Sequence, residues 1–192
     1  MNSLVCLTRD FYLRDTLAVA KELIGCKLAV LHNPEKPLTG TIIETEAYLG
    51  KADKACHSYK ASPFGRTNIM YGKGGYAYVY LIYGMYYCLN AVTRETGEPE
   101  AVLIRGILPD NASEKSANGP GKLTRFLAID KSFYGMDLTR ENPSKIFIAE
   151  ATDNNVQIRQ TTRIGVDYAQ EAADFEYRFY DNRYKHLIKG VK

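Results

Sequence analysis

The sequence has no tryptophan, only four cysteines and three histidines, and no long run of apolar residues. The cysteines form no Cys-x-x-Cys pair and the histidines stand far apart, so no ligand set with the spacing of a zinc site is present. We therefore expect free thiols in a reducing cytoplasm, no metal and no cofactor. No stretch approaches the roughly 18 apolar residues of a membrane span. The amino terminus lacks a basic segment followed by an apolar run, which argues against secretion.

An excess of charge of one sign is also missing, because the net charge of the 192 residues is only +3. This balance permits an anionic partner without requiring one. A hydrophobic content of 45% and a charged content of 24% are ordinary for a soluble globular protein. The chain has no repeat, low-complexity tract or linker. We expect one domain over residues 1–192, in which 181–192 form a loose basic tail.

Local patterns predict the elements of this domain. Asp15 before a group of apolar residues and Gly25 after it are typical of the two ends of a short helix. A second helix is expected over 120–129. Strands are expected at about 26–31, 39–48, 75–93 (a hairpin), 101–108 and 145–149, with loops at 51–67 and 110–118. These elements predict a mixed α/β (α+β) fold: a single compact domain around a curved, mainly antiparallel sheet with a protruding β-hairpin.

Tyrosine is the residue that this chain has in excess. Seven of its fifteen tyrosines lie between Tyr71 and Tyr87. The pair Tyr83-Gly84 sits where two strand-like runs meet, which predicts a hairpin turn with an aromatic ring at its tip. A large ring on a turn is a poor choice for solubility but a good wedge between nucleic-acid bases. The alternative is a tyrosine-rich, half-buried strand pair with no such role.

The segment 41–48 carries the most informative polar residues. With the period of two that strands have, Ile42, Glu44, Glu46 and Tyr48 share one face. A carboxylate beside aromatic rings would lose water, and desolvation makes it a useful general base. The alternative is an edge strand whose glutamates face solvent. Periodicity cannot decide which of the two glutamates matters.

Three more features could carry chemistry. His57 follows on the polar loop, where an ordinary surface histidine is the alternative. Asn90 and Arg105 are embedded in apolar strands, so each must find a partner, and each could simply tie down a loop. The Gly119-Pro-Gly-Lys122 turn at a helix start could bind a phosphate, although glycine and proline at a helix entry need no function.

Together these segments resemble the alkyladenine (3-methyladenine or methylpurine) DNA glycosylase family. The similarity extends from about Phe11 to Tyr180, with the motifs in the order and spacing of the family. The motifs are Glu44-Thr-Glu-Ala-Tyr-Leu-Gly50, His57-Ser58, Tyr78-Val-Tyr-Leu-Ile-Tyr-Gly-Met-Tyr-Tyr87, Gly119-Pro-Gly-Lys-Leu123 and Leu127-Ala-Ile129. The stretch 60–65 departs from the family because it lacks an arginine that contacts phosphate there.

The resemblance implies a monofunctional enzyme. It would flip alkylated or deaminated purines out of duplex DNA and hydrolyse the N-glycosidic bond, leaving an abasic site for base excision repair. Glu46 would activate the attacking water, with Arg105 beside it to hold the water and a phosphate. Tyr48, His57 and Tyr80 would surround the flipped base.

The resemblance also implies how DNA would be held. Tyr83 would fill the gap that the flipped base leaves, with Met85 beside it. Asn90 would crowd the 2-amino group of guanine, and Arg66 and Lys122 would contact phosphates. The partner would be double-stranded DNA containing damaged purines, bound by a monomer without a membrane. The location would be the cytoplasm with the nucleoid in a prokaryote, or the nucleus in a eukaryote.

Two other classes explain part of the sequence. A helix-hairpin-helix glycosylase would account for the Gly-Pro-Gly turn, but that class is mostly helical and the first hundred residues here are rich in strands. A non-catalytic nucleic-acid-binding module would account for the tyrosine hairpin, but it leaves Glu46 without a role.

Overall fold

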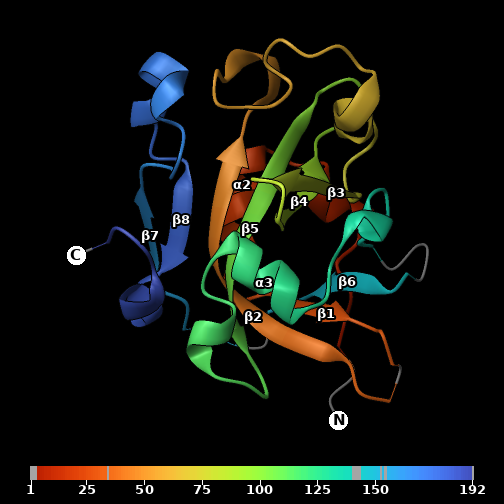
Figure 1. Ribbon diagram of the computed structural model, residues 1–192, viewed down its shortest axis with the longest axis vertical. Coiled ribbons are helices and arrows are strands. Elements are labelled where there is room, and N and C mark those ends of the chain that lie inside the picture. Colours follow the sequence, from red (N-terminus) through yellow and green to blue (C-terminus); the bar gives the residue numbers. More distant parts are fainter. Residues whose placement is uncertain (1–3, 34, 140–143, 152, 154, 192) are drawn as a thin grey trace.

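The computed structural model describes residues 4–33, 35–139, 144–151, 153 and 155–191. One antiparallel sheet of eight strands organises the chain (Figure 1). Six strands follow the order β3-β4-β5-β2-β1-β6, while β8 pairs with β2 and β7 pairs with β8. The strands are β1 (Lys27–Val30), β2 (Leu38–Tyr48), β3 (Ala77–Ile82), β4 (Tyr86–Thr93), β5 (Glu100–Pro109), β6 (Ile146–Ala149), β7 (Ile158–Thr161) and β8 (Arg178–Asp181).

The long strand β2 changes partners along its length, and this change bends the sheet. Its first residues pair with β1, whereas Glu44–Glu46 pair with β8 on the same side. The pairing with β5 shifts register around Ile43 and again after Glu44. A β-bulge of this kind bends a strand and interrupts the alternation of its side chains. Ile42 and Ala47 therefore both join the main core, although strict alternation assigns them to opposite faces.

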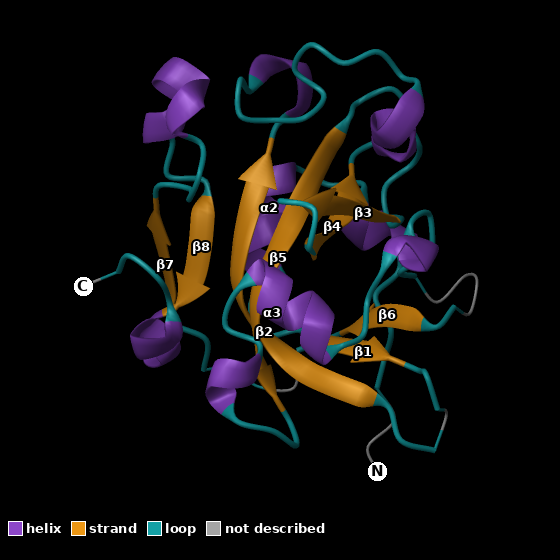
Figure 2. Cartoon of the chain, viewed as in Figure 1, coloured by secondary structure: helices purple, strands orange, loops and turns teal. Residues whose placement is uncertain are grey.

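Short helices cover the sheet (Figure 2). The α-helices are α1 (Arg9–Tyr12), α2 (Thr16–Glu22) and α3 (Pro120–Phe126). The 3₁₀ helices are η1 (Gly50–Ala52), η2 (Gly65–Tyr71), η3 (Glu114–Ser116), η4 (Lys131–Phe133), η5 (Asp167–Asp174) and η6 (Asn182–Leu187). Figure 1 shows α3 in front of the strands and α2 behind them. No helix among the described residues is long and apolar enough to cross a membrane.

Both expected α-helices are present, and their ends follow from the sequence. The Asp15 carboxylate accepts a hydrogen bond from the Ala18 N–H at 3.0 Å and so caps α2. Gly25, with φ of 92°, turns the chain after it. Pro120 opens α3, where its missing N–H costs nothing, but this helix ends at Phe126 rather than near 129.

Two parts of the carboxy-terminal region differ from the sequence-based expectation. The strands β7 and β8 were not expected, because their residues lack a clean apolar alternation: β7 is largely exposed and β8 is buried throughout. The segment 181–191 is packed rather than a loose basic tail. Leu187 and Ile188 are each 5% exposed and pack against Ile43 and Tyr180. The Leu187 carbonyl also accepts a hydrogen bond from Asn118 Nδ2 at 3.2 Å.

Candidate active site

The tyrosine hairpin is formed by β3 and β4, and its tip is open to solvent. Tyr83 and Gly84 form the turn with φ of 52° and 69°. A tyrosine rarely adopts a positive φ, so the backbone of this turn is strained at the residue that carries the exposed ring. The side chain of Tyr83 is 82% exposed and that of Met85 is 66% exposed. The predicted turn is therefore confirmed, and its tip is not half-buried.

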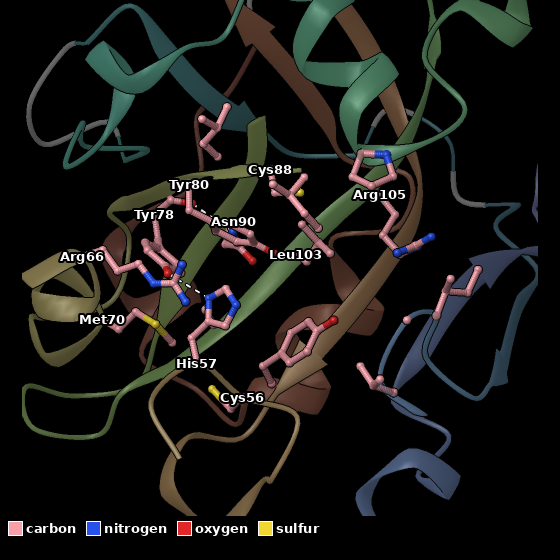
Figure 3. A pocket seen from close by; sticks show the side chains of 18 of the residues that line it. Cys56, His57, Arg66, Met70, Tyr78, Tyr80, Cys88, Asn90, Leu103 and Arg105 are labelled. Carbon is pink, nitrogen blue, oxygen red and sulfur yellow. Dashed lines mark hydrogen bonds between the residues drawn. The ribbon is translucent and has the colours of Figure 1, made fainter. Parts of the chain in front are cut away.

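A cavity of about 290 Å³ lies at the base of this hairpin, close to the smallest size usual for a small-molecule site (Figure 3). The register of the hairpin pairs Tyr78 with Asn90 and Tyr80 with Cys88, so these four side chains share the face that lines the cavity. The other walls come from β2, β5, the loop around His57, and the segment 164–168. Arg66 and Met70 of η2 and Pro120 of α3 complete the lining, so eight parts of the fold converge on one small space.

Glu46 lies directly behind the cavity wall and is completely buried. Its Oε2 accepts a hydrogen bond from the Tyr48 hydroxyl at 2.8 Å, and its Oε1 accepts one from the Ile164 N–H at 2.8 Å. Arg105 Nη1 lies 3.3 Å from Oε2. Tyr48, Arg105 and Ile164 all line the cavity, so the carboxylate is held at its edge by three cavity residues. The alternative of an edge strand with solvent-facing glutamates is excluded.

Glu44 lies in a different environment from Glu46. Its Oε1 accepts hydrogen bonds from Arg105 Nε at 3.0 Å and from Arg178 Nη1 at 3.1 Å, so its two partners are arginines. Burial acts to lower the pKa of Arg105, but the carboxylates of Glu46 and Glu44 outweigh it and raise that pKa. Two buried carboxylates and two buried arginines therefore form one balanced cluster, in which three cavity residues contact Glu46 and only Arg105 among the cavity residues is seen to contact Glu44.

His57 stands inside the cavity as a neutral ring. Its Nδ1 lies 2.9 Å from the Tyr78 hydroxyl, and its ring meets that of Tyr80 edge-on at 4.6 Å between centroids. Burial, with a smaller contribution from the positive charge of Arg66, lowers the pKa of His57 to about 4. Among the described residues no hydrogen bond to Nε2 is seen. The ring is therefore uncharged at neutral pH and has one nitrogen available to a ligand.

Asn90 is both a core residue and a cavity residue. Its Nδ2 donates to the Tyr78 carbonyl at 3.0 Å across the hairpin, and the residue is 3% exposed. It also lines the cavity beside Tyr80 (Figure 3). The bond to the neighbouring strand fixes the amide, so its volume is a fixed part of the cavity wall.

The two predicted phosphate contacts occupy different surroundings. Arg66 is exposed and lines the cavity at its rim. Lys122 is exposed on α3 but does not line the cavity, and its Nζ donates to Asn118 Oδ1 at 2.9 Å. A Cβ on Gly121 would come within 2.9 Å of the Tyr86 ring, so this glycine lets α3 approach the hairpin closely. A packing role thus explains part of the Gly-Pro-Gly turn, and its phosphate contact stays a prediction.

Sequence reasoning missed Arg163 and the segment that follows it. The Arg163 guanidinium is buried, donates to both carboxylate oxygens of Asp53 at 2.5 and 2.9 Å, and donates to the Ala47 and Ala172 carbonyls at 2.9 Å. The rings of Tyr48 and Tyr177 lie 4.9 and 5.3 Å from it. It therefore anchors the segment whose next residue donates its N–H to Glu46. Its partner Asp53 is 110 residues away in the sequence, so no local pattern could reveal it.

The described residues contain no group of histidine, cysteine, aspartate and glutamate side chains that could hold a metal ion. Two cysteine thiols, those of Cys56 and Cys88, line the cavity. Burial raises the pKa of the Cys56 and Cys88 thiols, so neither is an activated nucleophile. The reactive features of the cavity are therefore its buried carboxylate, its arginine and its aromatic rings.

Comparison with known proteins agrees with this arrangement. The family described as methylpurine-DNA glycosylase (MPG) matches residues 10–185. A protein of Desulfitobacterium hafniense (strain Y51) named "Putative 3-methyladenine DNA glycosylase" is 44% identical over 93% of this chain and 97% of its own length. A protein of the same name from Legionella pneumophila (strain Lens) is 47% identical over 93% and 96%. The chain therefore belongs to the methylpurine-DNA glycosylase family, whose members are DNA repair enzymes.

Proposed function

We propose that this DNA glycosylase flips an alkylated or deaminated purine into the hairpin cavity and hydrolyses its N-glycosidic bond with Glu46 as the general base. The observation that carries the proposal is the position of the Glu46 carboxylate. It is fully buried, yet hydrogen-bonded by Tyr48 and Ile164 and paired with Arg105, which are all cavity residues. A water molecule at this edge would give its proton to Glu46 while its oxygen attacks C1′ of the deoxyribose. The purine leaves with the bonding electrons, and an abasic site results.

The aromatic walls suit a damaged purine. Tyr78, Tyr80 and His57 offer ring faces and edges at the base of the cavity. A purine alkylated at N3 or N7 is cationic, and electron-rich rings attract such a cation by roughly 2 kcal/mol in a desolvated site. A neutral substrate such as hypoxanthine lacks this attraction. For such a base the free Nε2 of His57 supplies a hydrogen bond to the oxygen at position six.

The simplest experiment incubates the enzyme with a duplex that carries one 3-methyladenine or one hypoxanthine. Alkali then breaks the strand at any abasic site, and the broken strand is measured. The enzyme should generate alkali-labile sites at the lesion without cutting the strand itself, in EDTA as well as in buffer. Lesion-specific binding without any abasic product would support a non-catalytic module instead. A covalent DNA adduct trapped by borohydride would contradict hydrolysis by water.

Tyr83→Ala is expected to impair base flipping more than bond cleavage. Flipping costs a few kcal/mol of lost stacking and pairing. A ring that fills the vacated space offsets about 1–3 kcal/mol of this cost, which corresponds to a loss of roughly 5- to 150-fold in excision of a well-paired lesion. The deficit should shrink when the lesion lies opposite a mismatch. Single-turnover rates on the two duplexes measure this, and equal losses on both would contradict a wedge.

Asn90→Ser is expected to increase excision of guanine-derived bases relative to adenine-derived ones, because a smaller side chain leaves room for the 2-amino group. The same change removes the hydrogen bond to the Tyr78 carbonyl, which is worth about 1 kcal/mol of stability. Relative rates on 7-methylguanine and 3-methyladenine report the first effect, and thermal unfolding reports the second. A lower melting temperature with unchanged base preference would limit Asn90 to its core role.

The stability of the protein should depend on His57 in mildly acidic solution. The folded-state pKa of about 4 lies below the unfolded value of about 6.5, because burial disfavours the charged ring. The unfolded chain therefore binds more protons in this window, and the stability present above about pH 6.5 is lost as the pH falls toward 4. His57→Asn should reduce the loss of stability between these pH values. Urea unfolding of both proteins at the two ends of the window measures the difference, and equal losses would contradict a buried neutral histidine.

A further inference from the structure

A second cavity of about 670 Å³ lies beside the hairpin, along β3. The register of β3 and β4 pairs Leu81 with Tyr87, and both side chains line this second cavity. Because side chains alternate along a strand, they point away from the face of Tyr78 and Asn90. Tyr80, which lies on the face of Tyr78, also lines the second cavity, so this cavity extends around β3 from one face of the hairpin to the other.

The lining of the second cavity combines aromatic rings with cations. Tyr87 and Tyr134 supply rings, Asn68 supplies an amide, and Arg66 and Lys131 supply positive charge. No carboxylate belongs to the lining, and none of the described residues forms an ion pair with either cation. Rings on which a base can stack, next to cations that can hold a phosphate, are what proteins use to bind single nucleotides of a DNA strand.

One wall of the second cavity is rigid and touches the first cavity. The Tyr134 hydroxyl accepts a hydrogen bond from the Ile69 N–H at 3.1 Å, so the ring is fixed. This ring meets that of Tyr78 edge-on at 6.3 Å between centroids. Tyr78 in turn hydrogen-bonds His57 inside the first cavity. An occupant of the second cavity is therefore one ring away from the base-recognition residues.

Arg66, Tyr80 and Leu81 line both cavities, so the two sites meet at these residues. A DNA strand that delivers one nucleotide to the first cavity can pass along this edge. The Arg66 guanidinium can hold the phosphate between two successive nucleotides there, because its planar fork matches phosphate oxygens. The next nucleotide along the strand then reaches the mouth of the second cavity.

We propose that the second cavity binds a nucleotide that neighbours the lesion on the same DNA strand. Its base stacks against Tyr87 and Tyr134, and its phosphate lies between Arg66 and Lys131. This inference rests on the proposed function, because it requires the lesion strand to enter the first cavity. It adds that the enzyme unstacks two nucleotides of one strand, with Tyr80 and Leu81 of β3 between them.

Photocross-linking tests the occupant directly. A duplex carries a tetrahydrofuran abasic-site analogue in place of the lesion and 5-iodouracil at each neighbouring position in turn, on either strand. We expect a cross-link to Tyr87 or Tyr134 from one position next to the lesion on the lesion strand, identified by mass spectrometry. Cross-links to these tyrosines only from the opposite strand, or from no position, would overturn the proposal.

Lys131→Glu tests the phosphate contact, with Lys185→Glu as the matched control. Both lysines are exposed, both variants change the charge equally, and Figure 1 shows η4 and η6 on different sides of the molecule. The Lys131 variant should bind the duplex more weakly, with the slope of log Kobs against log salt reduced by about one phosphate contact, roughly 0.9. Equal affinities and slopes for the two variants would overturn the proposal.

The outcome for the second cavity can be separated from the outcome for the proposed function. Single-turnover excision at saturating DNA should be unchanged in the Lys185 variant, because Lys185 lines neither cavity. A protein that excises the lesion but gives no cross-link from the lesion strand overturns this inference alone. A protein that excises nothing overturns the proposed function whatever the cross-links show.

Discussion

Glu46→Gln is expected to lower the single-turnover rate of excision by about 10²–10⁴-fold, the usual contribution of a general base. The amide keeps the size of the side chain and can still accept the Ile164 N–H through its oxygen. It cannot take a proton from water at neutral pH. Binding to DNA that contains the lesion should be nearly unchanged, because the residue lies behind the cavity wall and not in the lining. Measuring the rate at saturating enzyme separates the two effects.

Glu44→Gln provides the matched control for this prediction. The two glutamates lie two residues apart on β2, both are buried, and both pair with Arg105. Removing the Glu44 charge leaves Arg105 and Arg178 with one carboxylate, so this variant should lose stability. Its folded fraction should still excise the lesion at nearly the wild-type rate. Loss of turnover in a folded Glu44 variant, together with retained turnover in the Glu46 variant, would refute the assignment.

The sequence predicted the hairpin and both α-helices well because their causes are local. The Tyr83-Gly84 turn, the Asp15 cap and the Pro120 helix entry each depend on residues within a few positions. The sequence also predicted that Glu46 and Tyr48 belong together, which the hydrogen bond between them confirms. Strand periodicity holds for this pair because both residues lie after the bulge.

What the sequence could not predict depends on contacts between distant segments. Nothing local distinguishes Glu44 from Glu46, because their difference comes from Arg178 and from the Ile164 N–H, which are 134 and 118 residues away. The packed end of the chain was missed for a similar reason, since Leu187 and Ile188 are buried in a cluster with residues of β2, β5 and β8. Arginines are seldom buried unless they are paired, and the sequence does not show that Asp53 is the partner of Arg163. The burial of Arg163 could therefore not be predicted.

Asp53→Asn is expected to destabilise the protein by about 3–5 kcal/mol, the usual cost of removing one partner from a buried ion pair. The Asp53 and Arg163 side chains are 1% and 0% exposed. An asparagine has only one acceptor oxygen, so it cannot accept both guanidinium bonds and also the backbone N–H groups of Leu49 and Ala55. The charge of Arg163 is left buried without a counter-charge. Urea unfolding measures the loss of stability.

Asp153→Asn is the control, because Asp153 also pairs with an arginine at 2.5 Å, but near the surface. Its side chain is 46% exposed and that of Arg183 is 26% exposed, so this change should cost no more than about 1 kcal/mol. Equal losses from the two changes would mean that the Asp53–Arg163 pair is not buried in solution.

The Asp53 change should also slow catalysis in the molecules that stay folded. Arg163 holds the chain that donates the Ile164 N–H to Glu46, and it also binds the Ala47 carbonyl between Glu46 and Tyr48. Loosening this anchor should lower the single-turnover rate while DNA affinity is kept, because neither Asp53 nor Arg163 lines the cavity. The double variant Asp53→Asn with Arg163→Gln should be less destabilised than the sum of the single changes, because the unpaired charge is gone. It should still be slow, since the anchor is still missing. A double variant that regains stability and the full rate would show that Arg163 acts on folding alone.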